Sequence, residues 1–252
     1  MLKIQYCSDL HLEFPENTKF LKINPIQAVG DILILGGDIG LFAEIKKYDW
    51  FFDDVSSKFK SVYWIPGNHE YYYSDINQRV GSFCEEIRHN VFLLNNQIIE
   101  LDGYQLIFTT LWSKISIKNE WNISRSMSDF QVIKKGNQKF TIDSYNNLFQ
   151  ENYDFLLNAL SLKNNKLQTI VASHHTPTFL NYPEKYKGSD LNEAFAVELH
   201  EIIENLAPDY WIFGHHHCNL EPFTIGTTTL LTNQLGYVKY HENELFSTSK
   251  FI

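Results

Sequence analysis

The chain repeats one local arrangement, a short apolar run that ends abruptly in polar residues. The runs occupy residues 3–7, 31–35, 62–65, 169–172 and 210–213. Short segments rich in Ile, Val, Leu, Tyr and Trp and bounded by Gly, Pro or polar residues are typical of buried strands. Each run is followed within three residues by His, Asp, Asn or Ser, so we expect five strands with polar side chains at their carboxyl ends.

The segments between these strands have helical length and periodicity. Residues 189–206 place apolar side chains on one helical face, and Pro208 ends the pattern. Residues 48–59, 74–89 and 143–162 are read as helices in the same way. Strand and helix in alternation predict parallel strands with helices outside the sheet, and ligands of such sheets bind beyond the carboxyl ends of the strands.

Further apolar runs are too closely spaced for helical crossovers. We predict that they form meander or hairpin strands that complete a second sheet, at residues 91–94, 98–101, 104–111, 227–231 and 236–240. Residues 113–140 are long, mixed and weakly periodic, which is typical of an excursion that covers a site as a lid. With 252 residues and 44% hydrophobic content, the whole chain, residues 1–252, is expected to form one α/β domain.

Composition limits the expected cellular location and the kinds of partner. The N-terminus lacks the apolar region of a signal peptide and no run reaches 18 apolar residues, so we expect a soluble, cytoplasmic protein without membrane contact. Cys7, Cys84 and Cys218 are widely spaced, which argues against a disulfide framework or a thiolate zinc site. The net charge of −9 disfavours extended nucleic-acid binding, whereas a small anionic substrate is compatible if bound cations reverse the local charge.

Histidines gather at the predicted strand ends. Seven of the ten follow the apolar runs, while His89, His200 and His241 lie elsewhere. Carboxylate and amide oxygens accompany them, and this donor set without thiolate suits first-row divalent ions such as Mn²⁺, Fe²⁺ or Zn²⁺. Six or seven ligands are too many for one tetrahedral zinc site, so they favour two ions that share a carboxylate.

The stretch FGHHHCN at residues 213–219 contains three consecutive histidines. In an extended chain successive side chains point to opposite sides, so His215 and His217 can reach one target while His216 points away. The alternative is a solvated polar loop, because a histidine-rich tract is by itself only a compositional hint of metal binding.

The ordered set of polar tips resembles the calcineurin-like metallophosphoesterase family. In chain order the tips are Asp9-x-His11, Gly37-Asp38, Gly67-Asn68-His69-Glu70, His174-His175 and Gly214-His215-x-His217. Each block alone is common, whereas the complete order over about residues 4–217 is specific. The resemblance implies an α/β fold, a four-layer α/β/β/α sandwich with two mixed sheets and a metal site at the carboxyl ends of the strands.

The resemblance also implies two divalent metal ions, Mn, Fe or Zn, and a ligand set for each. One ion would be held by Asp9, His11 and His217, the other by Asn68, His174 and His215, with Asp38 bridging them. His175 remains an alternative to His174, because adjacent side chains diverge; in the preferred assignment it is a substrate-binding residue.

His69 lies next to a predicted ligand and resembles the family's catalytic histidine. It would contact the phosphoryl group or protonate the leaving alkoxide, a role suited to a side chain that titrates near neutrality. Arg125 is the candidate for a further phosphate contact, with an ordinary surface charge as the alternative. Tyr71, Tyr72, Tyr73 and Trp112 could stack a ring of the substrate or simply pack.

The preferred function is a dinuclear-metal phosphoesterase acting on a small phosphomonoester or phosphodiester. The resemblance implies in-line attack by a hydroxide that bridges the two ions. The alternative is a non-catalytic metal-binding or protein-interaction module on the same fold. A nuclease or phosphoprotein phosphatase would need a basic groove or an added recognition domain, which the acidic chain does not show.

Overall fold

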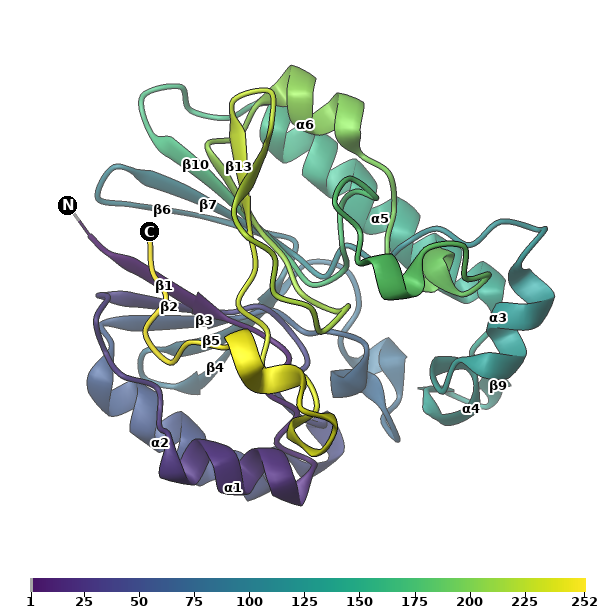
Figure 1. The fold of residues 1–252 in the computed structure, drawn as a ribbon, viewed down its shortest axis with the longest axis horizontal. Coiled ribbons are helices and arrows are strands. Elements are labelled where there is room, and N and C mark those ends of the chain that lie inside the picture. The colour runs from purple at the N-terminus through teal and green to yellow at the C-terminus, as the bar shows by residue number, and fades with distance from the viewer. Residues whose placement is uncertain (1) are drawn as a thin grey trace.

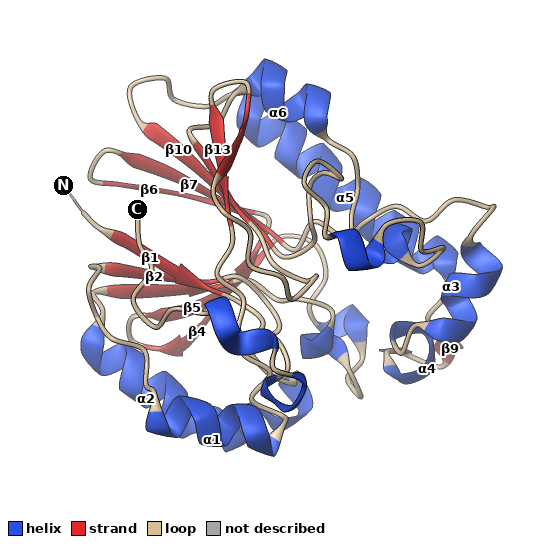
Figure 2. Ribbon diagram, in the orientation of Figure 1, coloured by secondary structure: helices blue, strands red, loops and turns tan. Residues whose placement is uncertain are grey.

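The computed structural model describes residues 2–252 and contains two large sheets that pack face to face. Helices cover the outer face of each sheet, so the layers run helix, sheet, sheet, helix (Figures 1 and 2). The predicted α/β/β/α sandwich with two mixed sheets is confirmed.

The first sheet has five strands in the order β1-β2-β3-β5-β4. Four of them are parallel and β4 is antiparallel to β5. Their bounds are β1 Ile4–Cys7, β2 Ile32–Leu35, β3 Ser61–Trp64, β4 Phe83–Arg88 and β5 Val91–Asn95.

The second sheet has six strands in the order β12-β13-β11-β10-β7-β6. Its central strands are parallel and the two edge strands are antiparallel to their neighbours. Their bounds are β6 Gln97–Leu101, β7 Tyr104–Thr109, β10 Gln168–Ser173, β11 Tyr210–Ile212, β12 Phe223–Ile225 and β13 Thr228–Leu231.

Helices α1 (Pro15–Ile23) and α2 (Asp49–Lys58) pack on the first sheet, and α5 (Ile142–Ser161) and α6 (His200–Leu206) on the second (Figure 2). The excursion from residue 113 to 140 contains a short hairpin and two short helices. These elements are α3 Glu120–Ser126, α4 Asp129–Val132, β8 Lys134–Lys135 and β9 Gln138–Lys139.

Strand β2 shows why the inner strands read as continuous apolar runs. Ile32 and Ile34 pack between the sheets with Phe108, whereas Leu33 and Leu35 pack toward the helices. A strand buried on both faces needs apolar residues at every position, unlike a strand with one solvated face. The continuous apolar run of β2 therefore reflects its burial on both faces.

Three sequence predictions of local structure are wrong. Residues 74–89 form a 3₁₀ turn and strand β4, because alternate residues of β4 are half-buried and exposed as on an edge strand. Of residues 189–206 only α6 is an α-helix. The earlier part is a 3₁₀ turn at Asn192–Ala194 and a loop in which Ala196 bridges to Thr176. Residues 236–240 are no strand, since Gly236 has φ +64° and a 3₁₀ turn follows.

The allocation of strands to sheets also differs from the expectation. Residues 91–94 belong to β5 of the first sheet, where Val91 pairs with Val62 of β3. Strands β10 and β11 belong to the second sheet. The carboxyl ends of β1, β2 and β3 therefore meet those of β10 and β11 across the two sheets, in the middle of the molecule (Figure 1).

The C-terminal residues run along the free edge of β1. Backbone hydrogen bonds join Ile4 to Ile252 and Tyr6 to Lys250, so the two ends of the chain lie side by side (Figure 1). None of the helices within residues 2–252 has the length and apolar character needed to cross a bilayer.

Candidate functional site

Five predicted metal ligands have left-handed backbone conformations, which non-glycine residues seldom adopt. They are Asp9 (φ 55°), His11 (φ 47°), Asp38 (φ 53°), His215 (φ 79°) and His217 (φ 52°). Each such residue costs free energy unless its surroundings hold it in place. Backbone hydrogen bonds do so here, for example from Asp9 N–H to the Gly37 carbonyl and from His11 N–H to the Asp38 carbonyl, both 2.9 Å. The loops after β1 and β2 thus hold each other.

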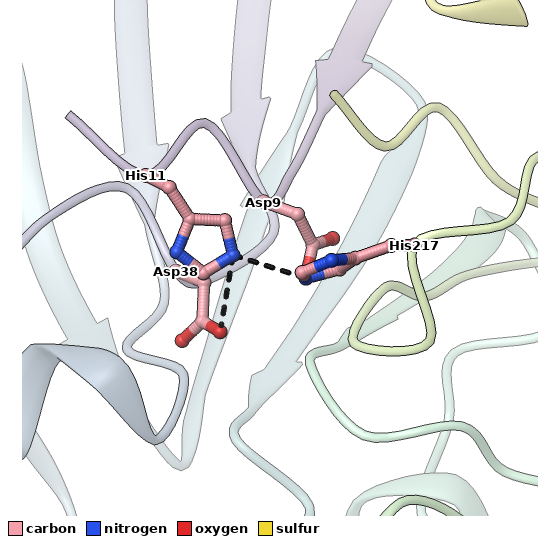
Figure 3. Close-up of side chains that lie close together, drawn as sticks. All are labelled: Asp9, His11, Asp38 and His217. Carbon is pink, nitrogen blue, oxygen red and sulfur yellow. Dashed lines mark hydrogen bonds and ion pairs between the residues drawn. The ribbon is translucent and has the colours of Figure 1, made fainter. Parts of the chain in front are cut away.

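The first cluster joins Asp9, His11, Asp38 and His217 (Figure 3). Nε2 of His11 lies 3.0 Å from Nε2 of His217 and 3.8 Å from Oδ2 of Asp38. Nε2 of His217 lies 3.4 Å from Oδ1 of Asp9. Four possible ligand atoms thus converge within 4.8 Å of one another.

The second cluster joins Asp38, His174 and His215. Nε2 of His174 lies 3.5 Å from Oδ2 of Asp38 and 3.1 Å from Nδ1 of His215. Oδ2 of Asp38 therefore approaches a histidine nitrogen of both clusters. The other carboxylate oxygen, Oδ1, accepts a hydrogen bond of 2.9 Å from the His69 backbone.

Asn68 has its amide held from one side only. Nδ2 donates to both carboxylate oxygens of Asp129, at 3.1 and 3.3 Å, and to the Tyr72 hydroxyl at 3.2 Å. Oδ1 is buried and has no hydrogen-bond partner among the described residues. Because buried polar atoms are normally satisfied, this oxygen indicates a missing partner such as a cation.

The four predicted histidine ligands each bond to the protein through the ring nitrogen that does not enter the cluster. Such outer partners fix the ring orientation and leave the opposite nitrogen for an ion. The pairs are His11 Nδ1 with Glu13 (3.0 Å), His217 Nδ1 with Glu242 (2.8 Å), His174 Nδ1 with the Gly36 carbonyl (3.0 Å) and His215 Nε2 with the Ala194 carbonyl (3.3 Å).

The surroundings shift the pKa of the two histidines of each cluster in opposite directions. Burial alone would lower the pKa of His217 and His174, but Asp9 and Glu242 raise the pKa of His217 to about 10 and Asp38 raises that of His174 to about 9. Burial lowers the pKa of His11 and His215 below the ordinary value. In each close nitrogen pair, 3.0 Å for His11 with His217 and 3.1 Å for His174 with His215, a histidine of raised pKa faces one of lowered pKa.

This donor set fits divalent cations. It offers imidazole nitrogens, carboxylates and one uncharged amide oxygen, and no thiolate, which suits Mn²⁺, Fe²⁺ or Zn²⁺. The unpartnered Asn68 oxygen and the Asp38 oxygen shared by both clusters are the two features that point to cations at this site.

Two glycines permit the close approach of the loops. A Cβ atom at Gly67 would lie 2.2 Å from Oδ1 of Asp38, and one at Gly214 would lie 2.5 Å from Oδ2 of Asp9. Both distances are far below van der Waals contact, so a side chain at either position would displace a predicted ligand. This close approach to Asp9 explains why the residue before His215 is a glycine.

Glu70 holds two of the site's loops together. Oε2 accepts from the backbone N–H groups of Asp38 (2.9 Å) and Gly67 (2.7 Å). Oε1 accepts from the Ile39 backbone (2.7 Å) and the Trp64 indole (3.0 Å). One fully buried carboxylate thus fixes the loop that carries Asp38 against the loop that carries Asn68.

His69 lies beside the first cluster and at the wall of a cavity. Nδ1 lies 2.9 Å from Oε1 of Glu13, the oxygen that also bonds His11, and the ring stacks on Tyr72. Nε2 lies 3.5 Å from the Tyr237 hydroxyl. Burial would lower the pKa of His69, but Asp38 and Glu13 offset it and the pKa lies above the ordinary value.

The cavity has a volume of about 740 Å³ and opens onto both clusters. Its wall includes Asp38, Asn68, His69, His215 and His217. The excursion contributes Ser126, Met127, Ser128 and Val132, so it forms part of the wall beside the site.

The two predicted substrate-binding residues lie outside this wall. His175 is fully buried, with its ring nitrogens 3.3 Å from the Tyr145 hydroxyl and 3.4 Å from the Thr110 carbonyl. Arg125 is exposed on α3, and its guanidinium lies over the Trp121 ring. His216, expected to point away from the metals, is buried and accepts hydrogen bonds at Nδ1 from the Cys218 backbone and Gln234.

Sequence reasoning assigned no role to Glu13, Glu70, Asp129 or Glu242. Glu13 had a signal, because it continues the alternation of Asp9 and His11. Glu70 lies within the Gly67-Asn68-His69-Glu70 block, so its position next to the predicted site was visible in the sequence. Asp129 and Glu242 had no local signal, since their partners Asn68 and His217 are 61 and 25 residues away.

Comparison with known proteins agrees with this geometry. Residues 2–219 match the family model described as calcineurin-like phosphoesterase. Uncharacterized protein L509 of Acanthamoeba polyphaga mimivirus is 36% identical, over 99% of this chain and 95% of the other. The crystal structure of phosphopantetheinyl hydrolase from Mycobacterium tuberculosis superposes with a TM-score of 0.72 at 15% identity, covering 99% of this chain and 95% of that chain. At 15% identity, the similarity to phosphopantetheinyl hydrolase bears on the fold alone. On the match of the family model to most of its length, the chain belongs to the calcineurin-like phosphoesterase family.

Proposed function

We propose that this protein hydrolyses a small phosphomonoester or phosphodiester with two divalent metal ions. The observation that carries the proposal is the shared oxygen of Asp38, which lies 3.8 Å from a histidine nitrogen of the first cluster and 3.5 Å from one of the second. A carboxylate between two sets of ligands is the arrangement that a two-metal phosphoesterase needs.

The proposed ligands follow from the two clusters. Asp9, His11 and His217 would hold one ion, Asn68, His174 and His215 the other, and Asp38 both. When bound, two divalent ions acidify a water molecule for in-line attack and neutralise charge on the phosphoryl oxygens.

The protein's own groups would orient this chemistry. The His69 backbone holds one oxygen of Asp38 at 2.9 Å, which leaves the other oxygen directed between the clusters. Asp129 holds the amide nitrogen of Asn68, so that the amide oxygen is the atom presented to the second cluster.

His69 is the proposed general acid. Its Nδ1 bonds Glu13, its pKa is raised by Asp38 and Glu13, and its Nε2 lies 3.5 Å from the Tyr237 hydroxyl at the cavity wall. From there it can protonate a leaving alkoxide or stabilise charge on the phosphoryl group. Glu13 bonds His11 through the same oxygen, so it positions a metal ligand and the acid together.

A screen of the metal-reconstituted protein tests the proposal. The expected result is turnover of p-nitrophenyl phosphate or bis(p-nitrophenyl) phosphate in wild type and its loss in Asp38→Asn. Binding of two ions without turnover of any phosphomonoester, phosphodiester or nucleotide in the screen would instead support the non-catalytic module.

A further inference from the structure

The cavity is much larger than a phosphate group needs. At about 740 Å³ it falls in the range of pockets that enclose a drug-sized ligand. Its wall carries seven aromatic side chains besides the histidines: Phe14, Tyr72, Tyr73, Tyr182, Tyr186, Phe195 and Tyr237. Aromatic rings bind other rings through stacking and apolar contact, so the wall suits a substrate with a ring in its alcohol portion.

The charge of the wall restricts that alcohol further. The residues assigned to the cavity wall within 2–252 include the carboxylates of Glu13, Glu44 and Glu242 but no lysine or arginine. Lys185 is close by, but its ammonium lies over the Tyr186 ring, 4.7 Å from the centroid, and is not part of the wall. Away from the metal site and its histidines, a second anionic group on the substrate would meet carboxylates and no lysine or arginine, which is how a site rejects a competitor.

Tyr73 is distinguished among the aromatic residues of the wall. Its side chain is 58% exposed although it lines the cavity. Its φ is +62°, a conformation that is an outlier for a bulky residue. The Tyr73 N–H donates to the Val132 carbonyl (3.1 Å), and Lys134 N–H donates to the carbonyl of Ser74 (3.0 Å), so the excursion holds Tyr73 in this conformation. A strained, exposed ring held at a cavity is a reason to look for a function.

We propose that the substrate is an ester of a single phosphate whose alcohol bears a ring and no further negative charge, and that this ring stacks on Tyr73. The inference rests on the proposed function for the position of the phosphate. It adds the class of alcohol and a residue that determines specificity.

Binding of phosphonates to the metal-loaded protein tests the substrate class without turnover. Benzylphosphonate, methylphosphonate and 4-carboxybenzylphosphonate share the head group and differ in the ring and the added charge. Calorimetry should show benzylphosphonate binding about 5- to 150-fold more tightly than methylphosphonate, the range of one stacked ring. The carboxylate should weaken binding relative to benzylphosphonate.

Variants of Tyr73 test the proposed stacking of the substrate's ring on this side chain. Tyr73→Asn removes the ring and suits a left-handed backbone, so it should bring the benzylphosphonate affinity close to that of methylphosphonate. Tyr73→Phe should retain the preference. Trp121→Ala removes another exposed aromatic side chain, outside this cavity, and should change nothing.

The inference is overturned if benzylphosphonate and methylphosphonate bind equally, if the carboxylate strengthens binding, or if Tyr73→Asn keeps the ring preference. Failure of the proposed function looks different. In that case the binding preferences would be present, while no phosphate ester is hydrolysed.

Discussion

Asn68 Nδ2 donates hydrogen bonds to both carboxylate oxygens of Asp129, at 3.1 and 3.3 Å. This contact decides which atom of the Asn68 amide is available to an ion. Asp129 is buried and touches no other proposed ligand through a hydrogen bond in the described chain; its other side-chain partner is the Tyr72 hydroxyl.

Asp129→Ala should therefore weaken the second ion and spare the first. Outer partners of metal ligands typically contribute about 10- to 100-fold in metal affinity or activity. A metal titration should show one site with wild-type affinity and one weakened by that factor, while Asp102→Ala, in an exposed turn, should match wild type. Wild-type affinity at both sites of Asp129→Ala would contradict this role.

His69→Ala should lower kcat with the metal content intact. A general acid contributes on the order of 10²- to 10⁴-fold, and the loss should be smaller for p-nitrophenyl phosphate than for an alkyl phosphate, whose leaving group needs the proton. The measurement is kcat for both esters with metals quantified, and the exposed His89→Ala serves as control. Loss of the ions from His69→Ala would make His69 a ligand instead.

Glu70→Ala should destabilise the metal-free protein. The change removes the acceptor of four hydrogen bonds to buried loops, and an unsatisfied buried donor costs about 1–3 kcal/mol. Urea unfolding should show a loss of about 3 kcal/mol or more, whereas Glu44→Ala, at a partly exposed carboxylate, should stay within about 0.5 kcal/mol. A Glu70→Ala protein as stable as wild type would show that these bonds are dispensable.

Metal binding should release protons and strengthen as pH rises. The pKa of His217 is raised to about 10 and that of His174 to about 9, so both carry an extra proton at pH 7 in the metal-free protein. Each must lose it to bind an ion, and lowering the pH therefore opposes binding. Calorimetric heats of Mn²⁺ binding should differ between buffers with different ionisation enthalpies; identical heats would show that no proton leaves.

The strand ends could be predicted from the sequence, because strands buried on both faces leave uninterrupted apolar runs such as residues 31–35. The helix predicted from periodicity at residues 189–206 is an α-helix only over His200–Leu206. Within residues 189–206, Leu191 and Phe195 line the cavity, while Ile203 packs against the second sheet. The apolar residues of this segment therefore pack in two different places and do not form one face of a single helix.

The proposed ligands follow strand ends, which made them visible as motifs. The groups that orient these ligands do not follow strand ends. Asp129 is 61 residues from Asn68 in the sequence and meets it only because of the path that residues 113–140 take in the fold. From the sequence, Tyr73 is only one of four aromatic residues near strand ends. Its left-handed backbone and exposure become apparent only from the folded chain.

The central claim is that one carboxylate, Asp38, joins two metal sites. Elemental analysis of the protein after reconstitution with Mn²⁺ and removal of unbound metal tests it most directly, with Asp38→Asn measured in parallel. We predict two ions per chain in wild type and a loss of both from Asp38→Asn, because the shared oxygen contributes to each site. At most one ion per chain in wild type, or two ions retained in Asp38→Asn, would contradict the claim.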